Sequence, residues 1–157
     1  MKARRRFLTA AVSLALLPCV ARAAVDDLRE NPVAPLDPRD PEILAVTKGA
    51  TIRAGKVRLE LPQLADNGNS VPIRITVDSP MTAADHVKSI HLYSERNPVS
   101  NMANFYLGPR AGKAEINSRV RLAGSQKVTA VAKLSDGSVW YDTAAIVVTL
   151  SACLDES

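Results

Sequence analysis

The chain has 157 residues and a formal net charge of +4, with 20 Lys and Arg against 16 Asp and Glu. Five of the basic residues and none of the acidic ones lie in residues 1–23, which leaves 15 basic and 16 acidic residues, a net charge of about −1, in the rest of the chain. This balance removes any charge-based argument for a nucleic-acid or membrane-surface partner, and we expect neither.

Residues 1–23 have the features of a cleaved export signal. A basic start that includes Arg4-Arg5-Arg6-Phe7-Leu8 leads into an apolar stretch, and Ala21-Arg22-Ala23 then offers a cleavage site. The apolar stretch is shorter than the roughly 20 residues that span a bilayer, which favours a cleaved signal over a retained anchor. The arginine run resembles the twin-arginine signal for export of folded proteins, although general secretion remains an alternative. The sequence therefore predicts a periplasmic protein.

Residues 24–55 are predicted to form an N-terminal arm that contains one short helix. Four prolines between residues 24 and 41 favour an extended chain, because proline restricts its own backbone and that of the preceding residue. A helix is expected from Pro41 to Ala50, with Asp40 as its N-cap and Gly49 as its stop. The expected apolar face of this helix comprises Ile43, Leu44 and Val46.

Residues 56–150 show the alternation of apolar and polar residues that is typical of half-buried antiparallel strands. Strands are expected at residues 57–61, 71–77, 87–94, 104–107, 115–122, 128–134, 139–144 and 145–150. Asp136-Gly137 lies between two of these runs and predicts a hairpin. Seven or eight short strands at this spacing predict an all-β, immunoglobulin-like antiparallel β-sandwich in a single domain.

The sequence offers little support for a metal site or for independent catalysis. His86 and His91 are five residues apart, so on one strand they would point to opposite faces, and we expect neither a metal nor a cofactor. No nucleophile elbow, nucleotide-binding glycine motif or Walker motif occurs. We therefore predict no catalytic residue and no independent enzyme activity.

Cys153 is the candidate functional residue. The only other cysteine is Cys19, inside the predicted export signal. An exported protein normally pairs its cysteines, so a single remaining thiol indicates intermolecular pairing or a reactive group. Its position near a chain end argues against an inert buried residue, because terminal residues are rarely held in a core. The predicted carrier arm is residues 151–157, in which Ser151, Ala152, Leu154 and Asp155 flank the cysteine.

Several segments together resemble the SoxY family, the sulfur-carrier subunit of the thiosulfate-oxidising system. The matching segments are Val57 to Pro72, Val77 to Thr82, Val87 to His91, Glu95 to Pro98, Arg119 to Ala123 and Leu134 to Trp140. A twin-arginine leader also fits this family. Each segment is a weak signal alone, but the set covers most of residues 56–150.

The resemblance implies a carrier rather than an enzyme. SoxY proteins are immunoglobulin-like, form a heterodimer with a SoxZ subunit and bear the substrate on a cysteine of a flexible C-terminal arm, here Cys153. The resemblance also implies transient partners: a SoxAX cytochrome pair joins thiosulfate to the thiol by oxidation, SoxB releases sulfate by hydrolysis, and SoxCD, where present, oxidises the remaining sulfane.

The C-terminal tail departs from the family pattern. The family's arm ends Gly-Gly-Cys-Gly-Gly, whereas Cys153 is followed by Leu154, Asp155 and Glu156. Glycines allow an arm to thread into narrow pockets, and nearby carboxylates disfavour a thiolate. Two interpretations follow: a divergent carrier with matched partner enzymes, which we prefer, or a paralogue that binds a SoxZ-like partner without carrying sulfur.

Overall fold

The computed structural model describes residues 41–150. The predicted export signal, the arm up to residue 40 and the predicted carrier arm with Cys153 lie outside the described residues. The described elements are helix α2 (Pro41–Thr47), a 3-10 turn η1 (Pro109–Ala111) and strands β1 (Ile52–Ala54), β2 (Val57–Glu60), β3 (Leu64–Asn67), β4 (Val71–Val77), β5 (Val87–Ser94), β6 (Asn101–Tyr106), β7 (Glu115–Val120), β8 (Gln126–Leu134) and β9 (Val139–Leu150).

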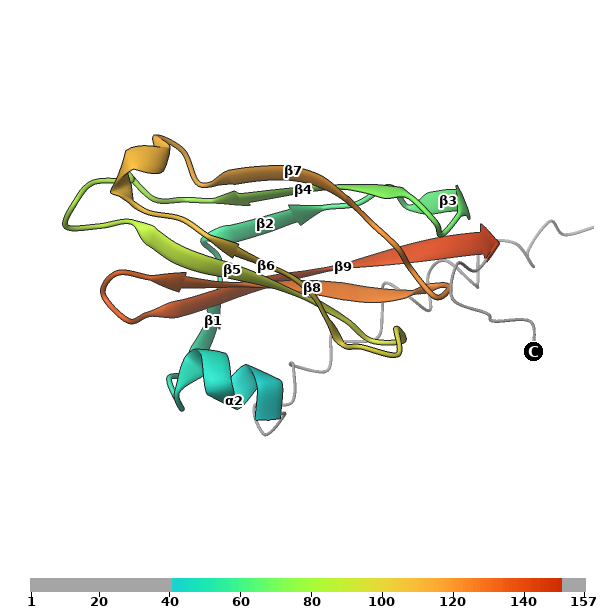
Figure 1. Ribbon diagram of the computed structural model, residues 1–157, viewed down its shortest axis with the longest axis horizontal. Helices are drawn as coiled ribbons and strands as arrows, with labels where there is room; N and C mark the ends of the chain where they lie inside the picture. Colours follow the sequence, from blue (N-terminus) through green and yellow to red (C-terminus); the bar gives the residue numbers. More distant parts are fainter. Residues whose placement is uncertain (1–40, 151–157) are drawn as a thin grey trace, which may run out of the picture. The chain divides into compact units, whose positions relative to one another are not determined.

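Two sheets pack face to face, which confirms the predicted all-β, immunoglobulin-like sandwich (Figure 1). The larger sheet has the order β1-β9-β8-β5-β6, and β3 also pairs with β9. The smaller sheet has the order β2-β4-β7. Strand β9 carries both β1 and β3 as parallel neighbours, β1 along its first residues and β3 along its last. Its other edge pairs antiparallel with β8 through the predicted hairpin, whose Gly137 has a φ of +85°.

The alternation of apolar and polar residues in the sequence determines which side chains form the core. In β4, Val71, Ile73, Ile75 and Val77 are buried while the residues between them are exposed or half-buried. They pack against the inner face of the larger sheet, where Ile90, Leu92 and Leu134 are fully buried. Burial of one such side chain stabilises the fold by about 1.5–3 kcal/mol, so the alternating pattern largely fixes which face of each strand points inward.

The outer face of the larger sheet is not open to water throughout, which corrects the expectation for the strand at residues 128–134. In β8 both the inward residues and Val131 and Thr129, on the opposite face, are buried. Helix α2 covers this face, because Ile43 packs in a second cluster with Tyr93, Val131 and Val139. Lys133 Nζ also donates to the Val46 carbonyl of α2, at 3.3 Å.

The helix is shorter than predicted, and its apolar face is only partly buried. It ends at Thr47, and the chain turns through Lys48 and Gly49, which both have positive φ. Gly49 therefore lies in the predicted stop, where a left-handed backbone favours glycine. Ile43 is buried, but Leu44 is 43% exposed, since only one side of this two-turn helix contacts the sheet.

Two strands were not predicted, and two predicted strands are one. Strands β1 and β3 are three and four residues long, and their pairing with β9 joins parts of the chain that are far apart in sequence. The predicted strands at residues 139–144 and 145–150 form the single 12-residue strand β9, because no turn residue separates them. Trp140 in β9 packs against the core and lies under the Arg53 and Lys56 side chains.

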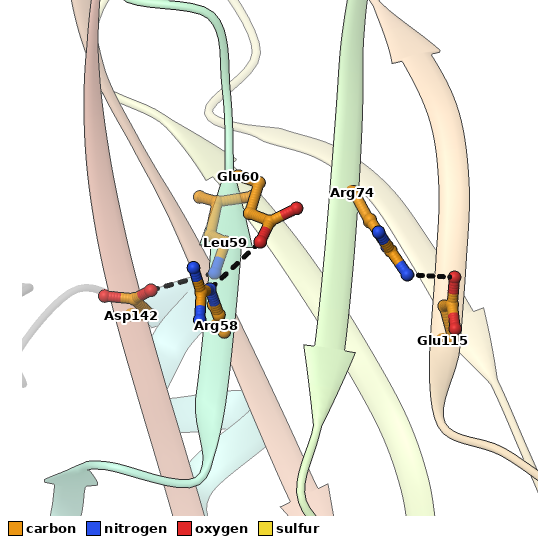
Figure 2. Close-up of polar contacts among 6 residues, drawn as sticks. All are labelled: Arg58, Leu59, Glu60, Arg74, Glu115 and Asp142. Carbon is orange, nitrogen blue, oxygen red and sulfur yellow. Dashed lines mark hydrogen bonds and ion pairs between the residues drawn. The ribbon is translucent and has the colours of Figure 1, made fainter.

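Asp142 joins the two sheets at the middle of β9. Strand β2 is one of the two outer strands of the smaller sheet, and the Leu59 amide on it donates to Asp142 Oδ2 at 2.8 Å (Figure 2). The other oxygen, Oδ1, accepts from the Thr143 amide at 2.8 Å. The carboxylate thus satisfies an edge amide that has no partner within its own sheet. The two ion pairs in the same view, Arg58–Glu60 and Arg74–Glu115, link neighbouring residues on the exposed face of the smaller sheet.

Replacing Asp142 with alanine is expected to destabilise the fold by about 2 kcal/mol, because the Leu59 amide would remain half-buried without its charged acceptor. Urea unfolding followed by tryptophan fluorescence measures this change. Glu60→Ala is the matched control: it removes the carboxylate of the exposed ion pair with Arg58 and should cost no more than about 0.5 kcal/mol. Equal effects of the two substitutions would contradict the role of Asp142.

Candidate functional site

The candidate site is the end of the sandwich at which β9 finishes with Leu150. Cys153 and its neighbours Ser151, Ala152, Leu154 and Asp155 lie outside the described residues, so the structure does not test them. Cys153 is three residues beyond Leu150, and a fully extended chain spans at most about 3.5 Å per residue. Three residues of chain can therefore place Cys153 at most about 10 Å from Leu150.

Strand β3 and the turn after it hold one side of this end. Leu64, Ala65 and Asn67 pair with Val147, Val148 and Leu150 in parallel register. The Gly68 amide donates to the Leu150 carbonyl at 2.8 Å, and the Thr149 hydroxyl donates to the Asp66 carbonyl at 2.7 Å. Asn67 Oδ1 accepts from the Asn69 amide at 2.7 Å, which tightens the turn. The last residues of β9 are consequently fixed up to Leu150 itself.

Ser125 holds the other side. Its hydroxyl accepts from the Val148 amide at 2.9 Å and donates to the Val148 carbonyl at 3.3 Å. The antiparallel ladder between β8 and β9 reaches only as far as Gln126 and Ile146. Ser125 therefore satisfies the backbone amide and carbonyl of Val148, two residues beyond the last β9 residue of the ladder.

Asn97 connects the two loops that surround this anchor. Its Oδ1 accepts from the Ala123 amide at 2.9 Å and from Gln126 Nε2 at 3.1 Å, and its Nδ2 donates to the Arg121 carbonyl at 2.9 Å. Gln126, 3% exposed, also accepts from the Ser94 hydroxyl and the Arg96 amide. This network, which we call the Asn97 network, joins the loop after β5 to the loop after β7 and so positions Ser125.

Cationic side chains are prominent around the end of β9 at Leu150, which we call the arm's base. Arg96 donates from Nη1 to the Ser125 carbonyl at 3.1 Å, and Arg119 donates from Nε to the Ser70 hydroxyl at 2.7 Å. The guanidinium of Arg121 is exposed and makes no hydrogen bond or ion pair with other residues in the range 41–150. The acidic residues nearby are Asp66 on β3 and Glu95, whose carboxylate accepts from the Lys127 amide at 3.1 Å. The described surface at this end thus has more cationic than anionic side chains.

The two histidines make separate contacts. His86 lies just before β5, and its Nδ1 is 3.1 Å from the Thr82 carbonyl. His91 is buried in β5, with Nδ1 2.7 Å from Asn104 Oδ1 and Nε2 3.0 Å from the Ser89 hydroxyl. Burial lowers the pKa of His91, helped by the charge of Lys133 and opposed by the Asn104 hydrogen bond. Within residues 41–150 no group of three or more His, Cys, Asp or Glu side chains is placed to hold a metal ion.

Of the helices in residues 41–150, none has the length and apolar character that a membrane span requires.

Replacing Asn97 with alanine is expected to destabilise the fold by about 2 kcal/mol, because the Ala123 amide and the Gln126 side chain would lose a buried acceptor. The same change should speed hydrogen exchange of the Leu122, Val148 and Gly68 amides, which depend on the anchored loops. Urea unfolding and exchange measured by NMR give the two readouts. Asn117→Ala is the control, since that exposed amide bonds only to Glu115. Unchanged exchange at Val148 in the Asn97 variant would show that the network does not support the arm's base.

Two segments behind the predicted resemblance, Glu95 to Pro98 and Arg119 to Ala123, meet in the Asn97 network, and a third, Val57 to Pro72, includes the turn that binds Leu150. In the sequence these segments are separate short motifs. In the structure they lie together and hold the end of β9. Asn97 and Ser125 were not predicted as site residues. Asn97 stood out only as part of the segment Glu95 to Pro98, because the groups it binds are 24 to 29 positions away in the sequence.

Comparison with known structures gives the fold. The sulfur carrier protein SoxY from Chlorobium limicola f thiosulfatophilum matches with a TM-score of 0.59 and 23% identity, over 71% of this chain and 96% of that one. Superoxide reductase (neelaredoxin) from Ignicoccus hospitalis matches with a TM-score of 0.53 and 20% identity, over 69% of this chain and 92% of that one. Superoxide reductase from Nanoarchaeum equitans matches with a TM-score of 0.52 and 15% identity, over 61% of this chain and 100% of that one.

At these identities the likeness shows a shared sandwich, and a carrier and an enzyme both have it. No curated protein matches the chain. The comparison with protein families is decisive, because the family of the sulfur oxidation protein SoxY matches residues 43–153, most of the chain, and its match includes Cys153. The chain therefore belongs to the SoxY family of sulfur oxidation proteins.

Proposed function

We propose that the chain is a periplasmic sulfur carrier that holds thiosulfate-derived intermediates covalently on Cys153. The observation that carries this proposal is the extent of the family match, which continues from the sandwich through the anchored end of β9 to Cys153. A carrier needs a rigid base and a short reach, and β3, Ser125 and the Asn97 network provide the base. A related sandwich from Chlorobium limicola f thiosulfatophilum is itself described as a sulfur carrier protein.

The prediction that the chain is a non-catalytic carrier subunit, rather than an enzyme, is confirmed by its membership of the SoxY family. The chemistry proposed for Cys153 needs enzymes from outside. Joining the thiol to the outer sulfur of thiosulfate forms one S–S bond, releases the thiol proton and gives two electrons to an external acceptor, for which a SoxAX-like cytochrome pair is proposed. A SoxB-like hydrolase would then add water and release sulfate, leaving a persulfide sulfur on Cys153 for a SoxCD-like enzyme.

The tail sequence supplies the alternative. Leu154 and Asp155 stand where the family has glycines, and Glu156 follows them. The bulk of Leu154 would hinder threading of the arm, and the two carboxylates would disfavour the thiolate. A paralogue that binds a SoxZ-like subunit without carrying sulfur is therefore the second candidate. The two proposals differ in one observable, the uptake of sulfur by Cys153.

Cys153 is expected to take up a thiosulfate-derived adduct that a reductant removes and that Cys153→Ser abolishes. The protein is isolated from the periplasmic fraction, incubated with thiosulfate and the cognate cytochrome, and analysed by intact mass. Cys19→Ser is the matched control and should leave the adduct unchanged, since Cys19 lies in the predicted signal. A wild-type protein that never gains mass with its own partners would favour the paralogue, and recovery only from the cytoplasm would contradict the periplasmic assignment.

The proposed heterodimer partner is a second sandwich subunit that resembles SoxZ, and we place its contact on the outer face of the larger sheet around Tyr106. Tyr106 lies on the outer strand β6 and is 78% exposed. Its ring meets the buried His91 ring edge to face, with the centroids 6.2 Å apart. Exposed tyrosines next to ordered polar groups are frequent anchors of protein interfaces, and outer strands need protection from random pairing.

Tyr106→Ser is expected to weaken the complex with the SoxZ-like subunit at least about tenfold, as for an interface anchor. Gel filtration and calorimetric titration of the co-expressed pair measure the change. Leu64→Ser is the control, because Leu64 is also exposed (58%) but lies on β3 at the arm's base. Wild-type proteins that elute as two separate peaks at micromolar concentration would contradict a stable heterodimer.

A further inference from the structure

An open groove runs between β6 and β7, the outer strands of the two sheets. Its volume is about 530 Å³. Val99, Met102 and Val120 supply apolar lining, and Arg119 and Arg121 also line the groove. Val99 is 65% exposed and lies beside other apolar residues of the groove. The groove therefore combines an apolar floor with two guanidinium groups.

The charge around the groove is cationic. None of its lining residues is acidic. Arg119 is oriented by Ser70, whereas the guanidinium of Arg121 has no partner within the described range. The other charged groups at this end, Arg96, Lys127, Asp66 and Glu95, belong to the neighbouring loop and strands. Glu115, the one carboxylate on β7, is engaged by Arg74 at 2.9 Å.

The groove lies within reach of the chain beyond β9. Gly68 connects the two, because its amide donates to the Leu150 carbonyl and its carbonyl accepts from the Leu122 amide, both at 2.8 Å. Two such steps separate Leu150 from Leu122 by about 10 Å, two strand spacings. Residue 154 is four positions beyond Leu150 and can extend about 14 Å. Arg121 directly precedes Leu122, so the tail can place Leu154 and the next two residues on the groove.

The tail sequence complements this groove, since an apolar residue is followed by two carboxylates in Leu154-Asp155-Glu156. We propose that this segment docks in the groove, with Leu154 on the apolar floor and the carboxylates of Asp155 and Glu156 on Arg119 and Arg121. The docked tail holds Cys153 against the end of the sandwich, and release of the tail presents the thiol to partners. The proposed function gives this docking its significance, because it would regulate access to the carrier thiol.

Docking also accounts for the departure from the glycine-rich arm. Free carboxylates beside Cys153 would oppose both the thiolate and an anionic substrate. Carboxylates paired with guanidinium groups have their charge compensated, so the thiol is relieved of most of that repulsion. Leu154, too bulky for a threading arm, has a place on the floor formed by Val99, Met102 and Val120.

The test is the mobility of residues 154–156, measured by ¹⁵N relaxation on the full chain at low and high salt. In the wild type at low salt, the order parameters of these residues are expected to exceed about 0.6, the limit below which a backbone is flexible. Arg121→Gln should lower them, and so should about 0.5 M NaCl, because exposed ion pairs are screened by salt. Arg110→Gln is the matched control, with the same loss of charge on η1 at the other end of the sandwich.

A charge reversal makes the test specific. Arg121→Glu should free the tail, and combining it with Asp155→Lys and Glu156→Lys should restore order, a coupling that independent sites do not show. A tail that is flexible in the wild type at low salt, or that is as ordered in Arg121→Gln and Arg121→Glu as in the wild type, overturns the proposal. These measurements involve no sulfur chemistry, so failure of docking is distinct from failure of adduct formation at Cys153.

Discussion

Hydrogen bonding along both edges of β9 is the constraint on which the rest of the domain depends. One edge pairs with β8 over its whole ladder, and the other is shared by β1 at the start, Asp142 and β2 in the middle, and β3 at the end. Strands β8, β1 and β3 each satisfy backbone groups of a different stretch of β9, whereas in the middle the Asp142 side chain satisfies the Leu59 amide of β2. A buried backbone group without a partner costs about as much as a lost hydrogen bond, so these short elements are needed to keep β9 extended to Leu150.

The likeness to superoxide reductases shows how little the sandwich itself says about activity. Those proteins and the SoxY from Chlorobium limicola f thiosulfatophilum share the fold with this chain at similar scores. What differs is the chemistry placed on the fold. Here the larger sheet presents a buried His91 with both ring nitrogens already in contact with Asn104 and Ser89, and the family match extends beyond the sheet to Cys153. The distinctive part of this protein is therefore the end of the sandwich from which the tail continues.

Sequence patterns predicted the elements whose signal is local. Strand β4 follows strict alternation, and the Asp136-Gly137 hairpin rests on two adjacent residues, so both were predicted correctly. Strands β1 and β3 were missed because they are short and exist only through pairing with β9, more than 80 positions later in the chain. The exposed face expected for β8 was wrong because Ile43 of α2 covers it. The supporting residues Asn97 and Ser125 were missed for the same reason as β1: their partners lie more than 20 positions away in the sequence. The prediction of Cys153 rested on the predicted export and on its position near the chain end. The structure of residues 41–150 does not test this prediction.

The position of β9 in the sheet has a consequence for how the protein is made. Strand β9 is the last strand of the described range to be synthesised, yet it lies inside the larger sheet and carries the pairing of β1 and β3. A growing chain that lacks residues 139–150 has no partner for these two strands or for one edge of β8. Closing loops of this length costs entropy before any contact compensates for it, so such pairings form late in folding. The domain thus completes itself only after its last strand is available, and the platform for the cysteine is among the final parts to become ordered.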